Sequence, residues 1–94
     1  MSNQPDMNAC FGRALDRANA RLNAAYAKAI KDDADDAKGV ELLRAAERAW
    51  LDFRDRSCAY QAHDDEGGSI YPTTLATCEI TMTDARTKEL QAPN

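Results

Sequence analysis

Three stretches of the sequence carry apolar residues at every third or fourth position, and this spacing constrains the fold more than any other feature. The α-helix repeats about every 3.6 residues, so such spacing gathers the apolar side chains on one helix face. The stretches cover residues 5–31, residues 36–63, and a third segment that begins near Pro72 and reaches Leu90. The expected stripe of the second stretch is Val40, Leu43, Ala46, Trp50, Phe53, Ser57 and Tyr60. We therefore predict an all-α chain.

Polar connections separate the three predicted helices. Residues 31–38 hold four aspartates and no bulky apolar residue, and residues 64–68 combine acidic residues with two glycines, which favour the end of a helix. Short connections make successive helices antiparallel neighbours. We predict an antiparallel three-helix bundle, a helical hairpin plus a third helix, in one domain that spans residues 1–94. Pro93 is expected to end the fold.

The charge balance is acidic, with 16 acidic against 12 basic residues and a net charge of -4. An acidic surface repels nucleic acid and anionic membranes, so a basic protein is the expected partner and nucleic acid is not. No apolar run approaches the roughly 18 residues that a transmembrane helix needs. The first ten residues also lack the basic and apolar regions of a secretory signal.

The three cysteines, Cys10, Cys58 and Cys78, are predicted to lie at one level of the bundle. A disulfide from Cys58 to Cys78 would join the second helix to the third, and we favour this pair. Bonds from Cys10 to either partner stay open as alternatives, as do three free thiols. An exposed Cys10 would allow two chains to join, so a dimer also stays open. Disulfides in so short a chain favour a compartment outside the cytoplasm.

The residues that usually carry chemistry do not form a recognisable set in this sequence. No Cys-x-x-Cys pair occurs and His63 is the one histidine, which argues against a zinc site. The acidic clusters lack the glycine and glutamate positions of a calcium loop. No nucleophile motif is present. We therefore predict no enzyme activity, no catalytic residue, no cofactor and no bound metal.

Charged residues alternate with the largest aromatic residues between positions 44 and 58. In an antiparallel alignment Arg86 falls near Trp50 and Glu47, where its guanidinium would stack on the indole and pair with the carboxylate. We predict a structural polar network made of Trp50, Arg54, Asp55, Glu47 and Arg86. A role for Arg54 or Arg86 in ligand binding is the alternative.

Several short motifs occur in an order that resembles a known protein family. They are MNAC at 7–10, LNAAY at 22–26, LRAAERAW at 43–50, FRD at 53–55, GGSI at 67–70, both Cys58 and Cys78, and the set Thr83, Arg86, Glu89 and Leu90. The pattern covers nearly the whole chain and resembles the lysozyme inhibitor LprI-like domain. Glu47 departs from it, since a glutamine is usual there.

The resemblance implies an exported bacterial protein, periplasmic or secreted, whose export signal is absent from this sequence. It implies inhibition of a peptidoglycan-degrading enzyme, either a basic lysozyme-like hydrolase or a toxin against which the chain gives immunity. An envelope interaction module or adaptor with no hydrolase target is the alternative. The lipobox cysteine of a lipoprotein is missing near the start, so no lipid anchor is expected.

The predicted binding element is the loop between the second and third helices. Its glycines allow close approach, and Ile70 and Tyr71 would fill a cleft beside acidic residues. The candidate partner-binding residues are Asp64, Asp65, Glu66, Gly68, Ser69, Ile70 and Tyr71. The alternative is a plain turn that only connects the two helices.

Overall fold

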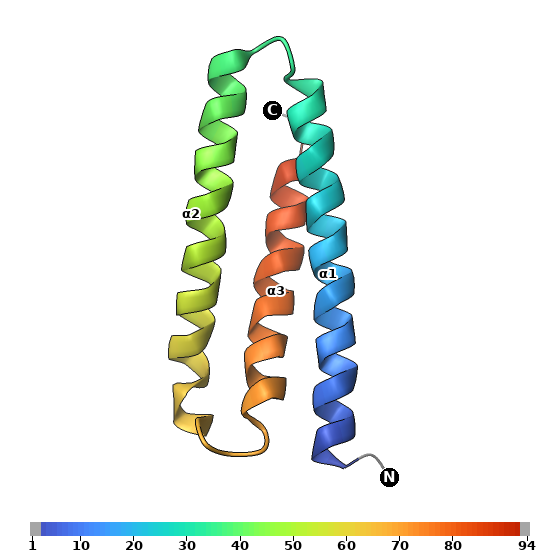
Figure 1. Cartoon of the computed structure of the whole chain (residues 1–94), viewed down its shortest axis with the longest axis vertical. Coiled ribbons are helices and arrows are strands. Elements are labelled where there is room, and N and C mark those ends of the chain that lie inside the picture. The colour runs from blue at the N-terminus through green and yellow to red at the C-terminus, as the bar shows by residue number, and fades with distance from the viewer. Residues whose placement is uncertain (1–2, 93–94) are drawn as a thin grey trace.

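A computed structural model describes residues 3–92, and within this range the chain forms three α-helices and one short 3-10 turn (Figure 1). The helices are α1 (Gln4–Asp32), α2 (Ala37–Ala62) and α3 (Tyr71–Gln91), and the 3-10 turn η1 (His63–Asp65) follows α2. The all-α prediction is confirmed, and α1 and α2 begin and end within one residue of the predicted limits. The expectation for Pro93 lies outside the described residues.

Polar side chains define where the first two helices begin. Asn3 Oδ1 accepts a hydrogen bond of 3.0 Å from the backbone N–H of Asp6, and Asp36 Oδ1 accepts one of 2.9 Å from that of Gly39. These contacts satisfy N–H groups that have no partner inside the helix. The start of α3 is different, because Pro72 in its first turn needs no such partner.

The three helices form a thin layer with α3 in the middle (Figure 1). The Cα atoms extend over 51 × 25 × 16 Å. α1 and α3 run in the same direction and α2 runs opposite to both. The three-helix architecture is as predicted, but α1 and α2 contact α3 far more than each other. The buried residues of α3 are Thr73, Ala76, Thr83 and Thr87, and such small side chains let α3 approach both neighbours.

The core is narrow and consists largely of small residues. Its buried hydrophobic members are Ala18, Leu22, Ala25, Cys58, Ala62 and Ala76. The predicted stripe of α2 is wrong in part, because Phe53 is 61% exposed, Tyr60 is 74% exposed and Ala46 is also exposed. The buried face of α2 instead includes Glu47 and Arg54. Because α2 packs mainly against α3 alone, it buries a narrower face than its apolar spacing predicted.

The Cys58–Cys78 disulfide joins α2 to α3, with the two Cα atoms 5.6 Å apart. Cys58 is fully buried, whereas Cys10 is a free and exposed cysteine on α1. The favoured pair is therefore the one that forms. The alternatives in which Cys10 bonds to Cys58 or Cys78, or all three thiols are free, do not occur.

Removal of the disulfide tests its contribution to stability. The bond closes a loop with a sequence separation of 20, for which the lost chain entropy is worth about 3 kcal/mol. We expect Cys58→Ala with Cys78→Ala to lower the free energy of unfolding by about that amount in urea denaturation. The control Cys10→Ser should change it by less than about 0.5 kcal/mol. Equal stability of the double variant and the wild type would contradict the expectation.

Candidate functional site

The 64–70 loop, which includes the last two residues of η1, connects α2 to α3 in a well-defined turn. Gly67 has a φ of 82°, a left-handed conformation that favours glycine. The backbone N–H of Gly68 donates to the carbonyl oxygen of Asp65 at 3.0 Å. A Cβ atom at position 68 would lie 3.2 Å from that same oxygen, closer than most such contacts. Gly67 is therefore favoured by its backbone conformation, and a side chain at position 68 would require a small shift of the Asp65 carbonyl.

Side chains from two helices hold the 64–70 loop in place. Asn8 Nδ2 of α1 donates to the carbonyl oxygen of Ser69 at 3.0 Å. Thr74 Oγ1 of α3 donates to Asp65 Oδ2 at 2.9 Å. The loop is thus attached both to the N-terminal end of α1 and to the first turns of α3. A loop fixed in this way loses little conformational entropy when a partner binds.

The predicted binding residues differ in how much they present to solvent. Asp64, Glu66, Gly68 and Ser69 are exposed, and Ile70 is 46% exposed. Asp65 and Tyr71 are half-buried, so Tyr71 offers less surface than the sequence indicated. The sequence did not point to the end of α2, where the exposed ring of Tyr60 stacks on His63 with ring centroids 5.6 Å apart. We define the loop-end surface as Tyr60, His63, Asp64, Glu66 and Ile70.

The charge of the loop-end surface depends on His63. The hydrogen bond to the carbonyl of Tyr60 raises the pKa of the His63 imidazole above its ordinary value, and the nearby Asp64 carboxylate raises it further. Nε2 of His63 lies 3.3 Å from Oδ1 of Asp64. The imidazole is protonated in mildly acidic solution and loses its charge as the pH rises through its raised pKa. The net charge of the loop-end surface therefore becomes more negative as the pH rises.

The predicted polar network centres on Arg54, whose guanidinium contacts all three helices. Nη1 donates to Asn19 Oδ1 of α1 at 2.9 Å and to Thr83 Oγ1 of α3 at 3.1 Å. Nε donates to Asp55 Oδ1 at 3.0 Å, and Nη2 lies 4.0 Å from Glu79 Oε2. Only 8% of Arg54 is exposed. These partners place Arg54 inside the fold.

Two further contacts complete the network. Arg86 Nε donates to Glu47 Oε1 at 3.0 Å, between side chains that are 15% and 9% exposed. The guanidinium above Trp50 belongs to Arg54, at 5.6 Å from the ring centroid, and not to Arg86 as the alignment indicated. The sequence also did not indicate that Asn19 belongs to the network. A polar residue next to a core alanine in a helix is usually expected to face solvent.

Substitution of Arg54 tests its role in joining the helices. Arg54→Ala leaves the half-buried Asn19 of α1 and the buried Thr83 of α3 without a charged partner, so we expect a loss of about 2–4 kcal/mol in the free energy of unfolding. Arg56→Ala is the matched control on the same helix, because its side chain is 80% exposed and pairs with Asp52. It should change stability by less than about 1 kcal/mol. Similar losses in chemical denaturation of the two variants would contradict this role.

Glu79 gives the network a dependence on pH. Burial raises the pKa of its carboxyl, the Arg54 guanidinium lowers it in part, and Asp55 raises it. A raised carboxyl pKa favours the folded state at low pH, and that contribution is lost as the pH rises through the folded-state pKa.

The stability of Glu79→Gln, measured relative to the wild type, should therefore increase as the pH rises from about 4 to about 7. Chemical denaturation at both pH values measures the difference. Glu89→Gln, at a side chain that is 64% exposed on the same helix, is the control and should show a smaller change. A difference between Glu79→Gln and wild type that is independent of pH would count against the assignment.

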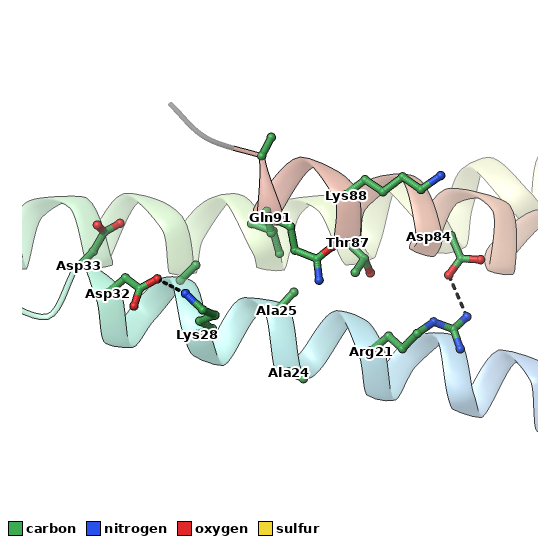
Figure 2. Close-up of a pocket in the computed structure, with 13 residues that line it drawn as sticks. Arg21, Ala24, Ala25, Lys28, Asp32, Asp33, Asp84, Thr87, Lys88 and Gln91 are labelled. Atoms are coloured by element: carbon green, nitrogen blue, oxygen red, sulfur yellow. Dashed lines mark hydrogen bonds and ion pairs between the residues drawn. The ribbon is translucent and has the colours of Figure 1, made fainter.

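A groove of about 940 Å³ lies between the C-terminal parts of α1 and α3 (Figure 2). Arg21 Nη2 lies 3.0 Å from Asp84 Oδ1 across it, and Lys28 Nζ lies 2.7 Å from Asp32 Oδ2 along α1. Alanines of α1 also line the groove. Because these charges neutralise one another, we regard the loop-end surface as the stronger candidate site.

Among residues 3–92, no three His, Cys, Asp or Glu side chains gather in a group able to hold a metal ion. Within the same range, none of the helices has an apolar stretch long enough to cross a membrane.

Comparison with known proteins gives one family match and two relatives. The model of the family described as "Lysozyme inhibitor LprI" matches residues 1–90. An uncharacterised protein of Rhizobium meliloti (strain 1021) is 33% identical over 99 residues, which cover 94% of this chain and 71% of the relative. The uncharacterised protein YecT of Escherichia coli (strain K12) is 28% identical over 98 residues, covering 90% of this chain and 60% of YecT.

A solved structure shares the fold. The crystal structure of a DUF1311 family protein from Pseudomonas putida KT2440 superposes with a TM-score of 0.85 at 25% sequence identity. The match covers 96% of this chain and 91% of that one. The layer of three helices is therefore found in a crystallised protein as well.

Proposed function

Because the chain belongs to the lysozyme inhibitor LprI family, we propose that it is a non-enzymatic protein of the bacterial envelope that binds and blocks a peptidoglycan-degrading enzyme. The target is a basic lysozyme-like hydrolase or a toxin, so the chain acts in defence or immunity. One observation carries the proposal beyond the family. The loop-end surface presents Ile70 beside the acidic Asp64 and Glu66 on a loop that two helices hold in place.

Charge favours association with a basic hydrolase. The chain has a net charge of -4, and opposite charges steer two proteins together at a rate that salt lowers. Asp64 and Glu66 are both exposed, and the connection between α2 and α3 that contains them lies at one end of the long molecule (Figure 1). In the proposed complex, these two carboxylates contact basic residues beside the enzyme's cleft.

Ile70 supplies the apolar part of the proposed contact. It is 46% exposed and precedes the first residue of α3, so its backbone is anchored. Burial of such a side chain in a cleft contributes about 1–2 kcal/mol. A protruding apolar residue with acidic neighbours is suited to a substrate-binding cleft, which is concave and lined by groups that recognise a polymer.

The disulfide supports a location in the periplasm or outside the cell. Cys58 and Cys78 form a bond that oxidising compartments maintain and the cytoplasm reduces. The same compartments contain the enzymes that degrade peptidoglycan, so the proposed target and the proposed location agree.

An inhibition assay tests the function. Cell-wall lysis by a panel of basic lysozymes should fall as the chain is added, and Ile70→Ala should raise the inhibition constant about tenfold. Asp64→Asn with Glu66→Gln should slow association and weaken its dependence on salt. Asp33→Asn with Asp35→Asn is the matched control, because it removes the same charge from exposed residues at the opposite end of the molecule.

Undiminished lysis at an excess of the chain over every hydrolase would refute the proposal and favour an adaptor without a hydrolase target. Inhibition that survives the changes at Ile70, Asp64 and Glu66 would keep the function but place its surface elsewhere.

A further inference from the structure

A side chain from the start of α1 reaches the part of the 64–70 loop that carries Ile70. Asn8, in the MNAC stretch at 7–10, donates from Nδ2 to the carbonyl oxygen of Ser69, a residue 61 positions further along the chain. The start of α1 and the connection between α2 and α3 lie at the same end of the molecule (Figure 1). Gly68, Ser69 and Ile70 are all exposed, so a bond that fixes Ser69 contributes strongly to the order of this segment.

Two donors fix the direction of the Asn8 amide. Its Oδ1 accepts a hydrogen bond of 2.8 Å from Gln4 Nε2, one turn earlier on α1, and a second one from Thr73 Oγ1 in the first turn of α3. Gln4 Nε2 also donates to Thr73 Oγ1 at 3.1 Å, which closes a ring of three side chains. An amide oxygen has two lone pairs, and both are used here. The Asn8 amide cannot turn over without breaking two bonds, so Nδ2 stays directed at Ser69.

Burial strengthens this ring of hydrogen bonds. Thr73 is 8% exposed, and Gln4 and Asn8 are half-buried. A buried hydroxyl that loses its partners is left desolvated and unpaired, so other orientations of the ring are disfavoured. The ring therefore transmits the position of α1 and α3 to the backbone at Ser69.

We propose that Asn8 is a positioning residue of the binding loop. Its amide holds Ser69 and so fixes where the adjacent Ile70 protrudes. The inference rests on the function proposed above, in which Ile70 supplies the apolar part of the contact. A loop that is ordered before binding loses less entropy in the complex, so affinity depends on Asn8 although Asn8 lies outside the loop-end surface.

The substitution Asn8→Asp removes the bond to the loop and keeps the acceptor of the ring. One carboxylate oxygen replaces Oδ1, while the other replaces the Nδ2 donor and repels the Ser69 carbonyl. The backbone N–H groups of Gly68 and Tyr71 close the turns of the loop and report on its order. We expect their hydrogen exchange in the free chain to become about five- to tenfold faster. Asn23→Asp, at an exposed position of the same helix, is the control and should leave it unchanged.

Acid should reverse the effect of Asn8→Asp. A protonated carboxyl carries an O–H that donates to Ser69 as Nδ2 does in the wild type. The faster exchange at about pH 7, measured relative to the wild type at the same pH, should disappear at about pH 3, below the ordinary pKa of an aspartate. A general loss of stability would not be rescued in this way. Circular dichroism verifies that the helices persist at both pH values.

The substitution Thr73→Val tests the ring, because the Thr73 hydroxyl bonds to Asn8 and Gln4 rather than to the loop. It should speed exchange at Gly68 by a similar factor. Adding Asn8→Asp should then have little further effect, since both changes act through one bond. Thr81→Val, at an exposed threonine of the same helix, is the control.

Inhibition of the basic lysozyme that the wild-type chain blocks most strongly measures the link to binding. Asn8→Asp should raise the inhibition constant about three- to tenfold, whereas Asn23→Asp should leave it within about twofold.

Each outcome decides one part of the inference. Unchanged loop exchange in Asn8→Asp and Thr73→Val, or faster exchange in Asn8→Asp that persists in acid, overturns the role of Asn8 whatever the enzyme assay gives. Faster loop exchange with an unchanged inhibition constant overturns the link to binding. Absence of inhibition by the wild-type chain refutes the proposed function, and the exchange rates then decide whether Asn8 orders the loop.

Discussion

The buried guanidinium of Arg54 is the interaction on which the arrangement of the three helices depends. The core around it is thin and made mostly of alanine, so apolar packing alone specifies the relative positions of the helices weakly. Arg54 on α2 donates at one time to Asn19 on α1 and to Thr83 on α3. A buried charge with several directional partners tolerates few alternative registers, because any shift leaves a desolvated group unpaired. The pair Glu47–Arg86 repeats this contact between α2 and α3 at a second level.

The central position of α3 determines which surfaces are left for function. Since α3 lies between the other two helices, α1 and α2 each keep a broad face towards solvent. On α2 that face carries the exposed apolar side chains of Leu42, Phe53 and Tyr60 among charged residues. A thin layer therefore has two kinds of free surface, the outer faces of the edge helices and the two ends where the connections lie.

The disulfide and the proposed binding loop belong to the same end of the molecule. Cys58 and Cys78 enclose the 64–70 loop, and Asn8 and Thr74 hold that loop to α1 and α3. The covalent bond limits how far α2 and α3 can separate there. A rigid loop with exposed acidic and apolar groups is the form expected of an inhibitor, which must fit its enzyme without being remodelled by it. If the proposed activity holds, the bond supports the loop that carries it as well as the fold.

The amino-acid sequence alone determined the helices and the limits of α1 and α2, and it favoured one cysteine pair without excluding the others. Apolar spacing, the side chains of Asn3 and Asp36, and Gly67 act over a few residues, and their effects can be read locally. Only the tertiary structure decided that Phe53 faces solvent and that Arg54 lies over Trp50. Periodicity shows that a helix has an apolar face, but whether a neighbour covers that face depends on contacts between residues far apart in the chain. For the same reason Asn19, which reads as a surface residue, became a partner in the buried network.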